Sequence, residues 1–262
     1  MDVVTWVSAA VALAGAAATA VLGYWQQKRL RTMEKRNLMD SYGASLAWAA
    51  FDLQTRLYNV LHGYRLDRSP GTGRGFLTVC LTHGTPHEAE YVRRSTVFVL
   101  AEYLGWVEIL RRDVQFLDLG RSRTNRRVMS QISEIGSVLG RMSPESNELR
   151  LFRTQQRALG ELMVHPDGEP GRRRCLGYAE FCHRLDTDEV FSEWFRRLLA
   201  DVDELAADAG PAVPRLEKVQ QLLMALIDLL DPKAERFPQF RQVFADEERP
   251  QPEGAVTPSA AG

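Results

Sequence analysis

The N-terminal segment constrains the architecture of this chain more than any other stretch. Residues 3–23 (VVTWVSAAVALAGAAATAVLG) contain no charged side chain over 21 positions. As an α-helix this segment would be about 31 Å long, which matches the hydrocarbon core of a bilayer. Tyr24 and Trp25 follow directly, and such aromatic side chains favour the headgroup interface. The pattern predicts a single transmembrane anchor over residues 1–25.

A cleaved signal peptide and a buried core helix are the two alternative interpretations. A secretory signal usually begins with positive charge, whereas the only charge before this run is Asp2. Ala18-Thr19-Ala20 resembles a cleavage site, but the apolar run continues to Gly23 and ends in basic residues, like a stop-transfer segment. A core helix would need a polar face, and this segment has only three scattered hydroxyl side chains.

Basic residues follow the apolar segment and none precedes it. The five nearest are Lys28, Arg29, Arg31, Lys35 and Arg36. Since basic residues favour the cytoplasmic side, we expect the N-terminus outside and the C-terminal domain in the cytoplasm. Of the 33 basic residues 29 are Arg, a bias typical of a GC-rich bacterial genome. The expected location is therefore a bacterial inner (plasma) membrane.

Three small residues recur on one face of the apolar segment. Gly15, Thr19 and Gly23 are spaced by four, and such a face permits close approach of two helices in a membrane. A homo-oligomer held by this face is one hypothesis. The alternative is chance, because the segment is rich in alanine throughout.

The net charge of −1 conceals two halves of opposite sign. Residues 24–160 carry 21 basic and 13 acidic side chains, whereas residues 161–262 carry 12 and 20. A basic membrane-proximal half suits an anionic lipid surface. Attraction between the two halves within one fold is the alternative. Three cysteines, Cys80, Cys175 and Cys182, fit a reducing compartment rather than a disulfide framework.

Apolar periodicity after the anchor is helical almost throughout, which predicts an all-α multi-helix bundle. We expect a stalk that becomes the first bundle helix at 26–66, a loop insert at 67–87 and a helical bundle domain at 88–245. Residues 76–81 (FLTVCL) could form a helical turn or a strand, and the helical form is favoured because no partner strand exists. The tail at 246–262 lacks large apolar residues and is predicted to be disordered.

Several local patterns mark helix starts within the bundle. Thr85-Pro86-His87-Glu88 is a capping box with proline at the first helical position. Ser143-Pro144 is expected to open another helix, which His165-Pro166 ends. Asp186-Thr187-Asp188-Glu189 is a second capping signature, and Pro214 opens the last long helix.

No stretch of the sequence identifies a reaction, and we assign no catalytic, metal-binding or cofactor-binding residue. Residues 71–75 (GTGRG) lack the GK[ST] of a phosphate loop. Gly84 and Pro86 separate His83 from His87, so this pair does not share a helical face. Cys182 and His183 are adjacent, and adjacent helical side chains point apart.

Two glutamates interrupt the most apolar helix of the soluble part. Glu108 reaches Arg111 or Arg112 at helical spacing, whereas Glu102 has no such partner on its own helix. Glu102 therefore either faces solvent or is buried and paired across helices. Arg157 and Glu161 are expected to join the same network. A structural ion pair is favoured over a functional carboxylate with a shifted pKa.

The densest basic cluster of the soluble part consists of Arg121, Arg123, Arg126 and Arg127. Few aromatic residues lie beside these arginines, which disfavours nucleic acid as a partner. Anionic lipid or an acidic partner fits better, and a plainly solvated face is the alternative.

We therefore expect a membrane-anchored cytoplasmic helical protein that acts by binding, as an adaptor, regulator or scaffold. Its expected partners are the lipid bilayer and a protein of unknown identity. The main alternative is an oligomerising membrane effector whose cytoplasmic domain senses a ligand. A helical-bundle enzyme built on buried carboxylates is disfavoured, because carboxylate metal sites in bundles use a pair of ExxH motifs and the sequence has only one, at residues 180–183.

Overall fold

The computed structural model describes the backbone of residues 3–62, 76–114, 123–144 and 146–237. Side chains at 3–5, 7–14, 17–18, 29–41, 62, 76, 114 and 123 are outside this description. Regular structure in these ranges is helical, and the one extended pairing found there is an isolated bridge between Val164 and Cys175. The predicted all-α class is confirmed.

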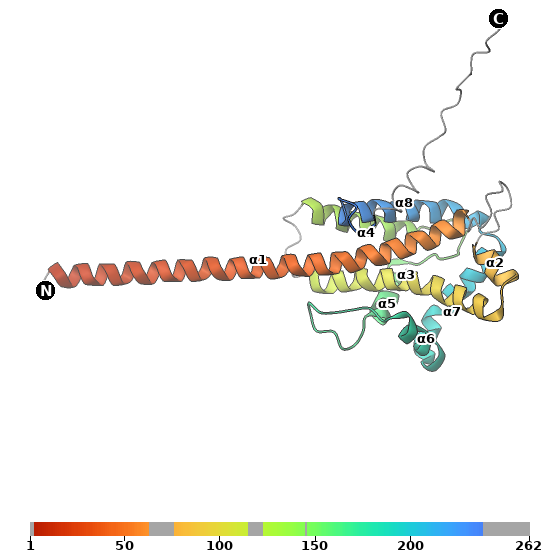
Figure 1. Cartoon of the computed structure of the whole chain (residues 1–262), viewed down its shortest axis with the longest axis horizontal. Coiled ribbons are helices and arrows are strands. Elements are labelled where there is room, and N and C mark those ends of the chain that lie inside the picture. Colours follow the sequence, from red (N-terminus) through yellow and green to blue (C-terminus); the bar gives the residue numbers. More distant parts are fainter. Residues whose placement is uncertain (1–2, 63–75, 115–122, 145, 238–262) are drawn as a thin grey trace, which may run out of the picture.

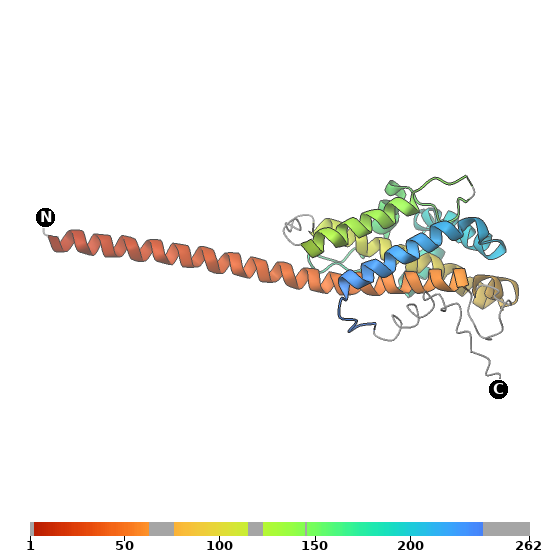
Figure 2. The same cartoon turned by 90° about the horizontal axis from the view of Figure 1, so that it is seen from above.

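The first helix, α1, is continuous over Val3–His62. The apolar segment and the first bundle helix are therefore parts of one helix. Its N-terminal part projects beyond the folded domain, and its C-terminal part lies inside it (Figures 1 and 2). Within the domain its buried side chains recur every three or four residues: Tyr42, Leu46, Ala50, Leu53, Leu57 and Val60.

The described residues include no helix that is long and apolar enough to cross a membrane. Most side chains of residues 3–23, the span expected from the sequence, are outside the described part of the chain. The structure does not support the predicted transmembrane anchor.

Helix α1 packs against two other long helices within the bundle (Figures 1 and 2). Helix α3 (Pro86–Val114) packs on one side of α1 and α8 (Val213–Leu230) on the other. Helix α5 (Arg153–Met163) packs on α3, and α4 (Arg123–Leu139) packs on α8. Polar contacts support this arrangement. Arg56 Nη1 lies 3.1 Å from Thr96 Oγ1, and Gln131 donates to the carbonyl of Leu222 at 2.9 Å.

Three further helices cover the end of the domain farthest from the N-terminus (Figure 1). They are α2 (Phe76–Thr82), α6 (Tyr178–Thr187) and α7 (Glu189–Ala207). Thr78 Oγ1 donates to the carbonyl of Ala206 at 2.8 Å, which ties α2 to α7. Buried aromatic rings, with centroids 4.8 to 5.7 Å apart, join α6 and α7 to α3: Phe98, Phe181, Phe191 and Phe195.

Two helix starts follow the predicted capping chemistry. The Thr85 N–H donates to Glu88 Oε2 at 2.6 Å, and the Glu88 N–H donates to Thr85 Oγ1 at 3.3 Å. Asp188 caps α7 by accepting from the Phe191 N–H at 3.0 Å. Asp186, in the same signature, instead pairs with Arg94 at 2.7 Å.

The prediction that a helix begins at Ser143-Pro144 was wrong. Helix α4 ends at Leu139, and α5 begins only at Arg153. Long-range hydrogen bonds hold the segment between them. The Leu149 N–H donates to Asp201 Oδ2 at 2.8 Å, and Leu149 has a φ of 52°, which an α-helix excludes. Leu149 and Leu151 are buried in this irregular conformation, and their burial stabilises it more than local helical propensity would stabilise a helix.

The last described elements are the 3₁₀-helix η2 (Gly210–Ala212) and α8, with Pro214 in its first turn as predicted. Phe237 is 3 % exposed and stacks on Phe51 of α1 with ring centroids 4.5 Å apart. The predicted tail at 246–262 lies outside the described residues.

Candidate functional site

A buried carboxylate holds α1 at the end of the domain where its N-terminal part projects. Asp113, on the last turn of α3, is 3 % exposed. Its Oδ2 accepts from the Tyr42 hydroxyl at 2.7 Å and from the Gly171 N–H at 2.9 Å. Arg173 Nε lies 3.0 Å from Oδ1. We call these four residues the Asp113 clamp, because they join α1, α3 and the α5–α6 loop.

The α5–α6 loop is shaped to present its part of the clamp. Two backbone hydrogen bonds join the ends of the loop. The His165 N–H donates to the Arg174 carbonyl at 2.9 Å, and the Leu176 N–H donates to the Met163 carbonyl at 2.8 Å. Between them Gly171 has a φ of 86°, a conformation that side chains disfavour. This turn directs the Gly171 N–H at the carboxylate. The Arg173 N–H also donates to the Tyr42 hydroxyl, at 3.2 Å.

The Tyr42 hydroxyl is a permanent donor in this clamp. Burial, followed by the hydrogen bond to Asp113, raises the pKa of Tyr42 to about 12. The phenol therefore stays protonated throughout the physiological range. Tyr42 is also the most N-terminal buried side chain of α1 within the described part of the chain.

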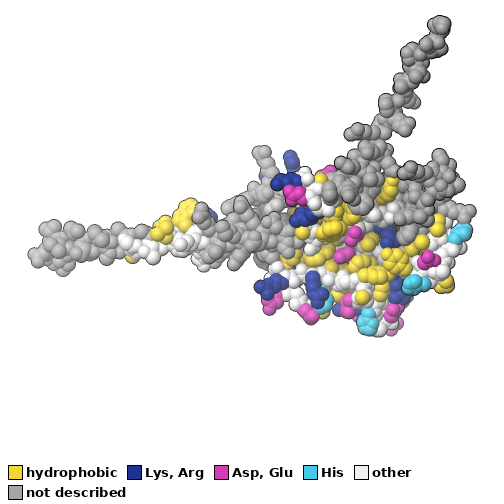
Figure 3. Space-filling model, in the orientation of Figure 1, with side chains coloured by type: hydrophobic (Ala, Val, Ile, Leu, Met, Phe, Trp, Pro, Cys, Tyr) yellow, Lys and Arg dark blue, Asp and Glu magenta, His cyan; other side chains and the backbone are white. Residues whose placement is uncertain are grey.

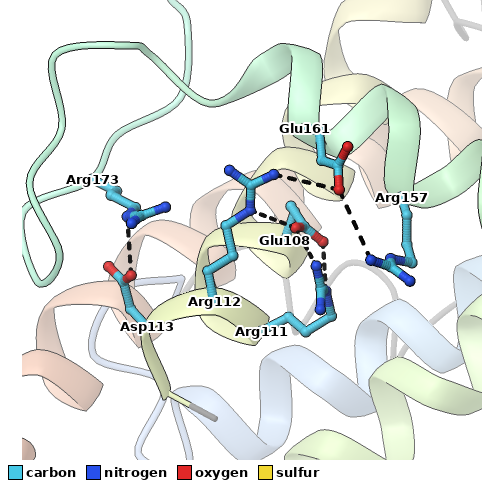
Figure 4. Close-up of polar contacts among 7 residues, drawn as sticks. All are labelled: Glu108, Arg111, Arg112, Asp113, Arg157, Glu161 and Arg173. Carbon is cyan, nitrogen blue, oxygen red and sulfur yellow. Dashed lines mark hydrogen bonds and ion pairs between the residues drawn. The ribbon is translucent and has the colours of Figure 1, made fainter. Parts of the chain in front are cut away.

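A second polar group, the Glu108 network, adjoins the clamp (Figure 4). Glu108 is 2 % exposed, and its carboxylate accepts from Arg111 Nη2 at 2.6 Å and Arg112 Nε at 2.6 Å. Arg112 Nη2 then reaches Glu161 on α5 at 3.4 Å, and Arg157 lies 3.9 Å from the same carboxylate. Glu108 thus pairs with both Arg111 and Arg112, and Arg157 and Glu161 extend the network onto α5.

Electrostatics keep Glu108 ionised. Burial by itself raises the pKa of this carboxyl, but hydrogen bonds from Arg111 and Arg112 outweigh burial and leave the pKa below its ordinary value. Both arginines are partly exposed, so their outer nitrogens face solvent at the same end of the domain.

Glu102 lies outside this network, contrary to one of the two sequence expectations. No arginine pairs with it among the described residues, and its carboxylate instead accepts a hydrogen bond from the Trp106 side chain. Burial, followed by the nearby charge of Asp52, raises its pKa to about 7. The position of Glu102 on α3 directs its side chain toward α1, where Asp52 lies, and not toward the arginines that follow Glu108.

Replacing Glu102 with glutamine is expected to stabilise the protein above neutral pH. Its carboxyl has a pKa of 4.5 in an ordinary setting and about 7 in the fold, so the fold loses stability as pH rises between these values. The neutral amide should therefore add about 1 kcal/mol near pH 8 and nothing near pH 4.5. Chemical denaturation of full-length protein in mild detergent measures both values, and an equal gain at both pH values would contradict the assignment.

The remaining predicted surface residues are placed as follows. Arg126 and Arg127 are exposed on the first turns of α4, at the end of the domain nearest the projecting helix (Figure 1). Arg121 and the side chain of Arg123 are outside the described residues. On α1, Lys28 lies 5.6 Å from the centre of the Trp25 ring. The side chains of the other basic residues in this stretch are also outside the description: Arg29, Arg31, Lys35 and Arg36.

The small-residue face of α1 is open. Gly15, Thr19 and Gly23 are exposed, and a Cβ added at either glycine would meet nothing within 4 Å. The Thr19 hydroxyl donates to the carbonyl of Gly15 at 2.8 Å, so its hydrogen bond is made within the helix.

The Cys175 thiol is not activated. Burial, together with the charge of Glu102, raises the pKa of the Cys175 thiol, which therefore stays protonated at neutral pH. Among the described residues no cluster of His, Cys, Asp or Glu could hold a metal ion. The geometry of this region suits positioning and binding through fixed charges.

Sequence reasoning missed the clamp. Neither Tyr42 nor Asp113 was singled out. The position of Asp113 directly after Arg111 and Arg112, at the end of the most apolar helix, was the available signal. The loop partners Gly171 and Arg173 could not be inferred, since they are 58 residues or more away in the chain.

No protein-family model, curated protein or solved structure matches this chain. The proposal below therefore rests on the residues and the geometry described above.

Proposed function

We propose that this protein is a membrane-tethered helical module that acts by binding a protein partner at the cytoplasmic surface. Residues 3–23 serve as the tether, with the N-terminus outside. The observation that carries the proposal is the continuity of α1, whose uncharged N-terminal segment and bundle core belong to one helix (Figure 1).

The character of the projecting part supports a tether. Between residues 6 and 25 its exposed large side chains among the described residues are apolar or aromatic, and Figure 3 shows a hydrophobic group partway along the projecting helix. They are Trp6, Val21, Leu22, Tyr24 and Trp25, with exposed fractions between 55 and 69 %. Such side chains exposed to water are unfavourable, whereas in a bilayer and its interface they are stabilised.

The clamp supports a mechanical role for the same helix. The Asp113 clamp fixes α1 to α3 and to the α5–α6 loop where α1 leaves the domain, and the Glu108 network fixes α3 to α5. A force or displacement on the tether would reach the domain core directly, without a flexible linker. This is the arrangement expected of an adaptor or regulator that must hold a defined orientation at a membrane.

In-membrane crosslinking of the tagged full-length chain, followed by mass spectrometry, tests this proposal. We expect a distinct protein partner, captured from membranes in constant ratio to the chain. Recovery of the chain alone would contradict the adaptor role and favour the second candidate. Turnover of a metabolite by the pure protein would contradict a role in binding alone.

The second candidate is an oligomerising membrane effector, and the open face of Gly15, Thr19 and Gly23 favours it. Replacing Gly15 and Gly23 with leucine should reduce crosslinked dimers in membranes about fivefold or more, because close helix approach is lost. The matched control replaces Ala16 and Ala20 with leucine, and both alanines are exposed on the adjoining face of the helix. Equal loss in both variants, or no loss in either, would exclude the glycine face as the contact.

A further inference from the structure

The domain contains an open pocket at the end opposite the Asp113 clamp. It has a volume of about 380 Å³. Its walls come from the end of α4, the segment that follows it, η2 and the first turn of α8. The lining residues are Val138, Arg141, Ser143, Gly210, Pro211, Pro214, Arg215 and Lys218. The volume lies within the range of small-molecule sites, which begins at about 300 Å³.

The charges that line this pocket are all positive. Arg141, Arg215 and Lys218 contribute three cationic groups, and no carboxylate is among the lining residues. Arg141 and Lys218 are exposed, and neither forms an ion pair within the described part of the chain. The pocket also faces the N-terminal end of α8, where the helix dipole is positive and the first turn has no acidic residue.

Arg215 is fixed in place before any ligand arrives. It is 8 % exposed, and its guanidinium donates to the carbonyls of Ser146 at 2.7 Å and Glu148 at 2.8 Å. These partners are neutral carbonyl groups, so they orient the arginine without neutralising its charge. The carboxylates whose charges act on Arg215 have other partners: Glu148 accepts from Ser146 Oγ, and Asp201 accepts from the Leu149 N–H at 2.8 Å. Asp208, beside the pocket, accepts from the Gly210 N–H at 2.9 Å.

The rest of the wall is apolar. Val138, Pro211 and Pro214 offer a surface for a hydrophobic body, and Ser143 adds a hydroxyl. A ligand that satisfies both parts carries a concentrated negative charge on a small apolar or aromatic group. A phosphate monoester meets this description, because it carries close to two negative charges at neutral pH and accepts several charge-assisted hydrogen bonds.

We propose that this pocket binds a small soluble phosphate monoester, with Arg141, Arg215 and Lys218 as its anion-binding residues. The site goes beyond the tethering and partner binding proposed above and does not depend on them. Its position at the far end of the domain from the N-terminus of α1 (Figure 2) favours a soluble ligand over a lipid headgroup of the tethering membrane. If occupied, it supplies the ligand that the second candidate function requires.

Isothermal titration of full-length protein in neutral detergent tests the site, with phenyl phosphate as the probe. Replacing both Arg141 and Lys218 with alanine should weaken binding about tenfold or more. Both side chains are exposed, so the double variant should fold. The matched control replaces Arg126 and Arg127 with alanine. Both arginines are exposed at the opposite end of α4, and their replacement removes the same amount of positive charge. Binding by this control should stay within about twofold of the original.

Three results would overturn the proposal. The first is absence of measurable phenyl phosphate binding by the unaltered protein. The second is an equal loss in both double variants, which would indicate general charge attraction. The third is tighter, Arg141- and Lys218-dependent binding of short-chain phosphatidylglycerol, which would identify a lipid headgroup as the ligand. None of these results bears on whether residues 3–23 tether the chain.

Discussion

Replacing Asp113 with alanine should lower the free energy of unfolding by about 3 kcal/mol, because it leaves buried donors on α1 and on the α5–α6 loop without their acceptor. The Tyr42 hydroxyl and the Gly171 N–H each lose a hydrogen bond of less than 3.0 Å, and Arg173 loses its ion pair at 3.0 Å. Chemical denaturation of full-length protein in mild detergent, followed by far-ultraviolet circular dichroism, gives the difference.

Asp203 provides the matched control for this substitution. It pairs with Arg93 at 2.7 Å, but its side chain is 48 % exposed. Exposed ion pairs contribute little, so Asp203→Ala should change the free energy of unfolding by about 0.5 kcal/mol or less. Equal effects of the two substitutions would show that the Asp113 clamp is no stronger than a surface pair, and would remove the physical basis for a rigid tether.

Replacing Gly160 with alanine should destabilise the protein by about 2 kcal/mol, because helices α3 and α5 touch at this residue. A Cβ at Gly160 would lie 2.6 Å from the carbonyl oxygen of Leu104 and 3.0 Å from Cβ of Glu108. The first contact is with backbone, so relief requires the two helices to separate. Separation would also lengthen the contact between Arg112 and Glu161, which bridges the same pair of helices.

Gly43 tests whether the effect comes from this close approach. It also lies within a helix, but a Cβ there would meet only Leu230 Cδ2, at an ordinary 3.8 Å. Gly43→Ala should therefore stabilise the protein by about 0.5 to 1 kcal/mol, the intrinsic helical gain of alanine over glycine. Denaturation midpoints of both variants, measured under one condition, compare them directly. A loss at Gly43 that matched the loss at Gly160 would refute the packing explanation.

The sequence was sufficient for the fold class and for most helices. Apolar residues at helical spacing place α1, α3, α7 and α8, and the Thr85–Glu88 capping box marks the start of α3. These signals are local, so they can be read from neighbouring residues. The segment after Ser143 was misplaced, since its conformation depends on Asp201, 52 residues from its partner Leu149.

The candidate site could be predicted only in part, for the same reason. Glu108 and its arginines are neighbours on one helix turn, and their pairing follows from spacing. The Asp113 clamp and the pocket lined by Arg141, Arg215 and Lys218 require segments that are far apart in the chain. Helix spacing says nothing about such contacts. Glu102 shows the same limit, because its proximity to Asp52 depends on how α1 packs on α3.

Alkaline carbonate extraction of membranes that contain the full-length chain tests the central claim, that residues 3–23 tether the domain to a bilayer. Carbonate releases peripheral proteins and leaves spanning ones in the pellet. We expect the unaltered chain and Ala16→Leu to remain in the pellet. Ala16→Arg should be released, because an arginine within the span costs about 3 kcal/mol. Release of the unaltered chain into the carbonate supernatant would contradict the account.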